Sequence, residues 1–318
     1  MKSTIFGRVI TIIISTIFIL SGKGLTQELP ENRVFGVIQH EVTYFSWRKI
    51  ETDRWETVFQ ISVKKRLAEN LCSEDNLEYA RKRKKVLCEF LGPAHFGFTQ
   101  KSLWYWGDGW DVQSWPIVET RNNPEIYWRW DNIDRNISES LRISGSVGLE
   151  HESNGGTGDA SRGWNWLFAQ IGTDEEINIV NTGRKFNIDE DTRKLLGVDY
   201  PGIRFKYHWP FGLDKINNPD IERFMGTLET KIHLGIKNTG DHFVLGGLPT
   251  DQAKKLKLSY VVTWRTHGLH SRNLKNEIMI SYADWELWLY IQRWDGTGQW
   301  LLDYREKRHS WRIGFVFR

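Results

Sequence analysis

Apolar and polar residues alternate along much of the chain with the period of two that is typical of a β-strand. In the segment 228–236, the even positions are aliphatic apart from Thr230, and Glu229, Lys231 and His233 occupy odd positions. The same alternation runs through five further segments: 59–63, 126–130, 203–209, 256–264 and 311–317. The pattern predicts an all-β protein whose strands have one apolar face and one polar face.

The composition indicates where the apolar face points. The chain holds 17 Trp, 10 Tyr and 16 Phe, yet its mean hydropathy is only -0.50. An antiparallel transmembrane β-barrel reconciles these values, because apolar residues that face lipid alternate with polar residues that face the lumen, and aromatic residues mark both membrane interfaces. A soluble β-sandwich could show the same alternation, but the aromatic excess and the N-terminus argue against it.

The N-terminus reads as a secretory signal peptide. Lys2 and Arg8 precede an apolar stretch at 9–20, which is followed by small and polar residues. This order predicts a signal peptide over residues 1–26, although an N-terminal anchor is the alternative. The remaining residues, 27–318, suit a single outer-membrane barrel rather than two domains.

Two segments interrupt the strand pattern and are predicted to be long turns, at about 67–91 and 178–202. The first could include a short helix and contains the basic run 81–85, which we interpret as a solvated face rather than a site for anionic lipid headgroups. It also contains Cys72 and Cys88, the only two cysteines of the chain. In an exported protein such a pair predicts a disulfide.

Candidate chemistry lies in the segment 141–156, where His151 and Ser153 fall on the apolar parity of a predicted strand. A histidine there could simply pack in a core, and a polar pair could mark the start of a loop. However, turn residues follow, and a hairpin centred near Gly158 would place Asn165 directly across from His151. A nucleophile, a base and an amide that orients the base would then meet on one surface.

Several blocks of the sequence resemble outer-membrane phospholipase A, in that family's order. The most specific is a His-x-Ser-Asn-Gly core followed by Ser-Arg-x-Trp-Asn, and the resemblance extends from about Gln39 to the C-terminus. The blocks are GLEHESNGGTGDASRGWNW at 148–166, FTQKSLWYW at 98–106, SWPIVET at 114–120, NNPDIERFMG at 217–226 and LLDY at 301–304.

The resemblance implies a twelve-stranded barrel with its active site on the outer wall, active as a calcium-bound homodimer. By position it implies Ser153 as the nucleophile, His151 as the general base and Asn165 as the residue that orients the base. The expected partners are membrane phospholipid and a second copy of the chain, with no nucleic acid.

The resemblance also implies calcium ligands, although less directly. They are the backbone carbonyls of Gly156 and Ser161, the Ser114 hydroxyl of the partner subunit, and position 217. The family has an acidic residue there and this chain has Asn217, so we expect weaker calcium binding or a site that is built differently, because calcium prefers carboxylate oxygens. The loops could equally be plain turns.

The sequence therefore predicts a calcium-dependent phospholipase A1 or A2 of the outer membrane that hydrolyses acyl esters of glycerophospholipids. The alternatives are a catalytically silent barrel, acting as a pore or a structural protein, and a lipopolysaccharide deacylase with similar chemistry.

Overall fold

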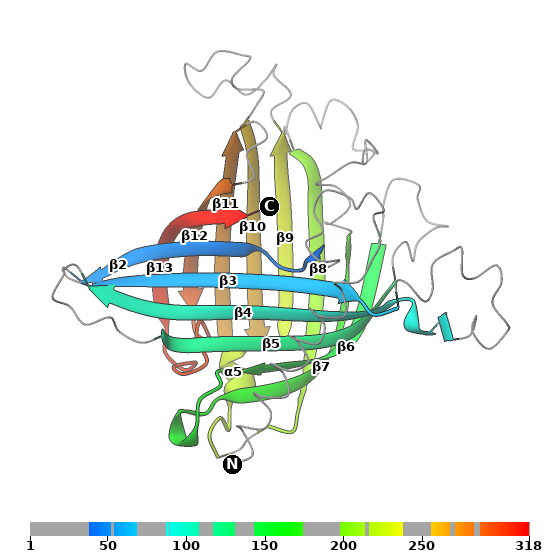
Figure 1. The fold of residues 1–318 in the computed structure, drawn as a ribbon, viewed down its shortest axis with the longest axis horizontal. Helices are drawn as coiled ribbons and strands as arrows, with labels where there is room; N and C mark the ends of the chain where they lie inside the picture. The colour runs from blue at the N-terminus through cyan, green and yellow to red at the C-terminus, as the bar shows by residue number, and fades with distance from the viewer. Residues whose placement is uncertain are drawn as a thin grey trace, which may run out of the picture.

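In the described part of the chain, twelve antiparallel strands, β2 to β13, close into a barrel (Figure 1). The elements are β1 (Ile38–Gln39), β2 (Thr43–Glu51), β3 (Arg54–Arg66), β4 (Ala94–Gly107), β5 (Ile117–Trp130), β6 (Ile143–Ser153), η1 (Gly158–Ala160), β7 (Gly163–Thr173), β8 (Val198–Phe211), α5 (Ile221–Met225), β9 (Leu228–Lys237), β10 (Leu256–His267), β11 (Ser271–Tyr282), β12 (Leu287–Gly296) and β13 (Arg308–Phe317).

The computed structural model describes residues 38–51, 54–68, 87–88, 90–107, 117–130, 143–173, 198–213, 216–237, 256–267, 271–282 and 287–317. Within these ranges, no helix has both the length and the hydrophobicity that crossing a membrane requires. The predicted signal peptide lies outside the described residues.

Strands that follow one another in sequence pair with one another, and the barrel closes where β2 pairs with β13. There Thr43 lies opposite Phe317, and Trp47 lies opposite Ile313. The two residues of β1 extend the sheet along β3. Closure leaves every long strand with a neighbour on each side, which satisfies backbone groups that an open edge would expose. The predicted antiparallel barrel and its twelve strands are confirmed.

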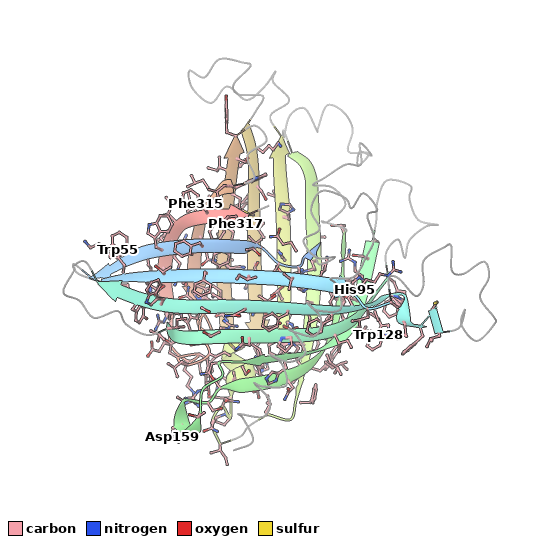
Figure 2. The ribbon with its side chains drawn as sticks, viewed as in Figure 1. Trp55, His95, Trp128, Asp159, Phe315 and Phe317 are labelled. Atoms are coloured by element: carbon pink, nitrogen blue, oxygen red, sulfur yellow. The ribbon has the colours of Figure 1, made fainter. Side chains whose placement is uncertain are left out.

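The two faces of each strand have opposite chemistry. On β9 the aliphatic Leu228 and Ile232 are 39% and 38% exposed, whereas Glu229 and Lys231 are buried. On β13, Phe315 and Phe317 lie on the outer face (Figure 2), and Val316 between them is fully buried. The predicted alternation is therefore confirmed, with apolar residues outside and polar residues inside. A soluble β-sandwich would bury its apolar face instead.

The interior is filled largely by ion pairs. Glu229 binds Arg204 at 3.0 Å and Arg265 at 2.6 Å. Glu41, in the segment between β1 and β2, binds Arg204 on the opposite wall at 3.2 Å and Lys231 at 3.2 Å. These contacts, together with two clusters of buried apolar side chains, leave a polar cavity of about 190 Å³.

The boundaries of the two predicted long turns are partly described. In the first, residues 87–88 and 90–91 are helical, in agreement with the short helix predicted there. The second prediction was wrong at its end, because β8 begins at Val198 rather than after residue 202. Val198 pairs with Ile236 and Tyr200 with Gly235, with an irregular register between them. Asp199, Pro201 and Gly202 hide this strand start from the alternation pattern. The other residues of both segments lie outside the described ranges.

The cysteine prediction is consistent with the structure. Cys88 is disulfide-bonded, and Cys72, which lies outside the described residues, is the only other cysteine in the sequence.

We expect reduction of the Cys72–Cys88 bridge to leave the barrel intact, because the bridge closes a segment between β3 and β4 and crosses no strand pair. Loop-closure entropy assigns about 3 kcal/mol to a bridge of this span, and this should act mainly on that segment. Heat-induced gel-shift assays with and without reductant measure the effect, with Cys72→Ser as the matched variant. Loss of the folded band on reduction at room temperature would contradict this expectation.

Candidate active site

The register of the β6–β7 hairpin brings the three predicted residues together. His151 lies directly opposite Asn165, and Ser153 lies opposite Gly163. The turn between the strands contains the 3-10 segment η1. The predicted opposition of Asn165 and His151 is confirmed, because opposed residues of an antiparallel pair share a face.

The His151 and Asn165 side chains form a hydrogen bond of 2.7 Å between Nδ1 and Oδ1. An amide oxygen can only accept, so Nδ1 of the imidazole must carry the proton and donate it. A neutral His151 ring then has its lone pair on Nε2. The amide therefore selects the tautomer in which Nε2 can accept a proton.

Gly163 lies next to both Ser153 and His151. A Cβ atom added to Gly163 would lie 3.3 Å from Ser153 Cβ and 3.8 Å from His151 Cε1. The bare Cα of Gly163 therefore lies against both side chains, and a larger residue there would press on the nucleophile candidate.

The site lies among exposed apolar side chains on the outer wall. Leu149 precedes His151 on the same face of β6, and Leu167 follows Asn165 on β7; each is 46% exposed. Phe211 of β8 lies opposite Asn165 and is 48% exposed. Figure 2 shows Asp159 at the tip of the β6–β7 turn, beyond the end of the barrel. The site is thus at the edge of an apolar surface, close to a turn.

The inner face of β6 is anchored by charge. Glu152, between His151 and Ser153 in sequence, is buried and forms an ion pair with Arg121 of β5. It also accepts a hydrogen bond of 3.0 Å from Trp164 Nε1 on β7. Arg121 donates in turn to the Gln299 carbonyl at 2.9 Å. These interior contacts fix the backbone that carries the outer site.

The turn after Ser153 is organised by Asn154. Its Nδ2 donates to the Ala160 carbonyl at 2.8 Å, and its Oδ1 accepts from the backbone N–H groups of Gly156 at 3.1 Å and Arg162 at 2.9 Å. One side chain thus holds both halves of the turn. The hydrogen bonds of Asn154 therefore fix the path of the backbone directly after the candidate nucleophile.

The residues predicted to bind calcium are partly brought together. Gly156 and Ser161 lie in this turn, Asn217 lies in the segment before α5, and Ser114 is outside the described residues. All four would bind through an oxygen atom, which is the type of ligand that calcium prefers. However, the described residues contain no group of three or more acidic, His or Cys side chains that could hold a metal, and Arg162 Nη1 donates to the Ser161 carbonyl at 2.9 Å.

Sequence reasoning missed the contribution of Asn218, which is fully buried. Its Nδ2 donates to the Gly163 carbonyl at 2.8 Å. Two residues later, Asp220 accepts from the Tyr304 hydroxyl at 2.7 Å and from Arg305 at 2.8 Å. Burial raises the pKa of the Asp220 carboxyl, but these hydrogen bonds lower it below its usual range overall. Asn218 and Asp220 belong to the NNPD block and Tyr304 belongs to the LLDY block, and both blocks carry the family resemblance. No local pattern in the sequence indicates that these two blocks contact each other.

An antiparallel barrel with a serine, a histidine and an asparagine gathered on its outer wall defines a small class of candidate hydrolases. The family model described as phospholipase A1 matches residues 34–317. The chain therefore belongs to the phospholipase A1 family.

The chain is also similar to one curated protein and, in fold, to solved structures. A putative phospholipase A1 of Neisseria meningitidis is 25% identical over 83% of this chain, and the chain spans about half, 55%, of that protein. The calcium-bound dimer of Salmonella typhi outer membrane phospholipase has a similar fold, with a TM-score of 0.58 and 17% identity over 95% of this chain and 97% of that one. An asparagine-to-alanine active-site mutant of Escherichia coli outer membrane phospholipase A also has a similar fold, with a TM-score of 0.58. The two sequences are 16% identical, and the match covers 95% of this chain and 96% of that one.

Proposed function

We propose that this protein is a calcium-dependent phospholipase A of the outer membrane that hydrolyses acyl esters of glycerophospholipids. The observation that carries the proposal is the His151–Asn165 hydrogen bond, placed beside Ser153 on an exposed apolar wall. Family membership supports the substrate class. The Escherichia coli relative, whose active site includes an asparagine, supports the role assigned to Asn165.

In the proposed mechanism, Ser153 Oγ attacks the ester carbonyl while His151 Nε2 accepts its proton. Asn165 keeps the ring in the tautomer that allows this transfer. His151 then returns the proton to the departing alcohol, and an acyl-enzyme on Ser153 remains until water hydrolyses it. An amide gives the imidazolium less charge stabilisation than a carboxylate would, so Asn165 acts mainly by orientation.

The developing oxyanion needs positive charge or N–H donors nearby. The backbone N–H of Ser153 is one donor of the proposed site. The carbonyls of Gly156 and Ser161, with Ser114 of a second copy and Asn217, would hold calcium, which supplies positive charge near the oxyanion when bound. A homodimer would also add a second wall along which acyl chains lie.

The proposed location follows from the same features. Residues 1–26 would direct export and be removed, and the apolar outer face would contact lipid in the outer membrane. Phospholipid then reaches the site by lateral diffusion, past exposed side chains such as Leu149 and Leu167. The pore alternative is less well supported, because ion pairs such as Glu41–Arg204 cross the described interior.

Ser153→Ala should leave the barrel folded, because it removes one hydroxyl at the end of β6, and should lower ester hydrolysis by at least about a thousandfold. Fatty-acid release from mixed micelles measures the activity, and mass spectrometry locates the adduct of a long-chain alkylsulfonyl fluoride. Ser144→Ala, on the inner face of the same strand, is the control. It should keep both the fatty-acid release and the labelling by the sulfonyl fluoride. An adduct at another serine would show that Ser153 is not the nucleophile.

Asn165→Ala should lower kcat by about ten- to hundredfold, or roughly 1.4–2.7 kcal/mol of transition-state stabilisation, with little change in KM. The loss should be smaller than that of His151→Ala, because the base remains and only its orientation is lost. Asn165→Asp should retain more activity than Asn165→Ala, since a carboxylate can also accept from Nδ1. Equal losses in the Ala and Asp variants would count against the orienting role.

Asn217→Asp should lower the calcium concentration for half-maximal fatty-acid release, because a carboxylate binds calcium better than an amide. Ile216→Asp is the matched control, since it adds the same charge at a side chain that is 91% exposed one position away. Ser114→Ala should weaken calcium-dependent activity and calcium-dependent cross-linking of dimers together. Full activity in excess chelator would rule out the calcium mechanism for this chain.

A further inference from the structure

Two sequence blocks meet beside the candidate active site, NNPD at 217–220 and LLDY at 301–304, and the proposed mechanism uses only Asn217 of them. Asn218 is fully buried, and it belongs to the segment that joins β8 to α5. Burying an amide is costly unless it forms hydrogen bonds. The side chain is therefore expected to have a specific task at this position.

The Asn218 amide is directed at the backbone of β7. Its Nδ2 donates to the Gly163 carbonyl at 2.8 Å, and Gly163 is the first residue of β7 and lies opposite Ser153. Its Cα faces both Ser153 and His151, as the short distances from an added Cβ indicate. A shift of the Gly163 peptide would therefore change the contact surface beneath the nucleophile and the base.

The segment that carries Asn218 is itself held from the β12–β13 loop. Tyr304 and Arg305 both bind the Asp220 carboxylate, and the Tyr304 side chain is buried. The loop is fixed in turn by Glu119 of β5, which accepts from the backbone N–H groups of Leu301 at 2.7 Å and Leu302 at 3.0 Å. The segment that carries Asn218 is thus linked through Asp220 to the β12–β13 loop, and through that loop to β5.

We propose that Asn218 is a positioning residue for the reaction, which holds the Gly163 peptide so that Ser153, His151 and Asn165 keep their relative geometry. This inference rests on the proposed function. Asn165 lies two residues beyond Gly163 on the same strand, so a displaced start of β7 would also alter the His151–Asn165 bond. Small displacements of reacting groups cost rate rather than substrate affinity.

The test compares Asn218→Leu and Asn218→Asp, which remove the N–H donor at similar volume, with Asn273→Leu. Asn273 is a buried asparagine at the same end of the barrel that donates to the Phe224 carbonyl at 2.6 Å and is not seen to contact β6 or β7 among the described residues. The measurements are the labelling rate of Ser153 by a long-chain alkylsulfonyl fluoride, kcat and KM in mixed micelles, and the heat-induced unfolding midpoint.

We expect both Asn218 variants to lower kcat and the labelling rate by about ten- to hundredfold, with KM within about twofold. Asn273→Leu should lower the unfolding midpoint and leave the labelling rate within about twofold. A wild-type labelling rate in a folded Asn218 variant, or an equal loss in Asn273→Leu, would overturn the inference.

Three further outcomes keep the result decisive. If neither Asn218 variant folds, Tyr304→Phe, which removes one hydroxyl from the support of Asp220, must lower the labelling rate for the inference to stand. If Ser153→Ala keeps full activity, the proposed function itself fails. If Ser153→Ala is inactive while Asn218→Leu reacts as wild type, only the positioning role is wrong.

Discussion

The closed hydrogen-bonded register of the barrel is the constraint on which the rest of the structure depends. Each long strand pairs on both sides, so no strand can shift by one residue without reversing its two faces. On β6 such a shift would turn Glu152 outward and His151 inward, which would break the ion pair with Arg121. The charged interior and the outer site therefore stabilise the same register from opposite faces.

This coupling explains how the polar residues of the candidate site can stand on an apolar wall. Outward polar side chains gain nothing from the interior network, so their geometry must come from neighbours on the same face and from the backbone beneath. The His151–Asn165 hydrogen bond is the contact between neighbours on the same face. The anchored residues Glu152 and Trp164 hold the backbone beneath. Orientation is thus provided by the sheet, and the hydroxyl of Ser153 needs only to be adjacent.

The sequence predicted those features that depend on local spacing. The alternation fixed which residues of β9 and β13 face outward, and counting through the β6–β7 turn placed Asn165 opposite His151. The sequence pattern could not predict long-range contacts such as Glu41 with Arg204 or Asp220 with Tyr304, because no local period links residues so far apart. The start of β8 at Val198 was missed because Asp199, Pro201 and Gly202 break the alternation.

The contrast between Asn165 and Asn218 shows what kind of information is missing. Both are asparagines whose amides form a hydrogen bond with one partner. The partner of Asn165 lies in the same hairpin, whereas the partner of Asn218 lies on a strand more than fifty residues earlier in the sequence. The first could be found by counting along two strands. The second needs the path of the segment after β8, because β8 ends with Phe211 opposite Asn165 and no strand period continues from there to Asn218. Long-range support of an active site is therefore a property of the fold and not of the motif that carries the chemistry.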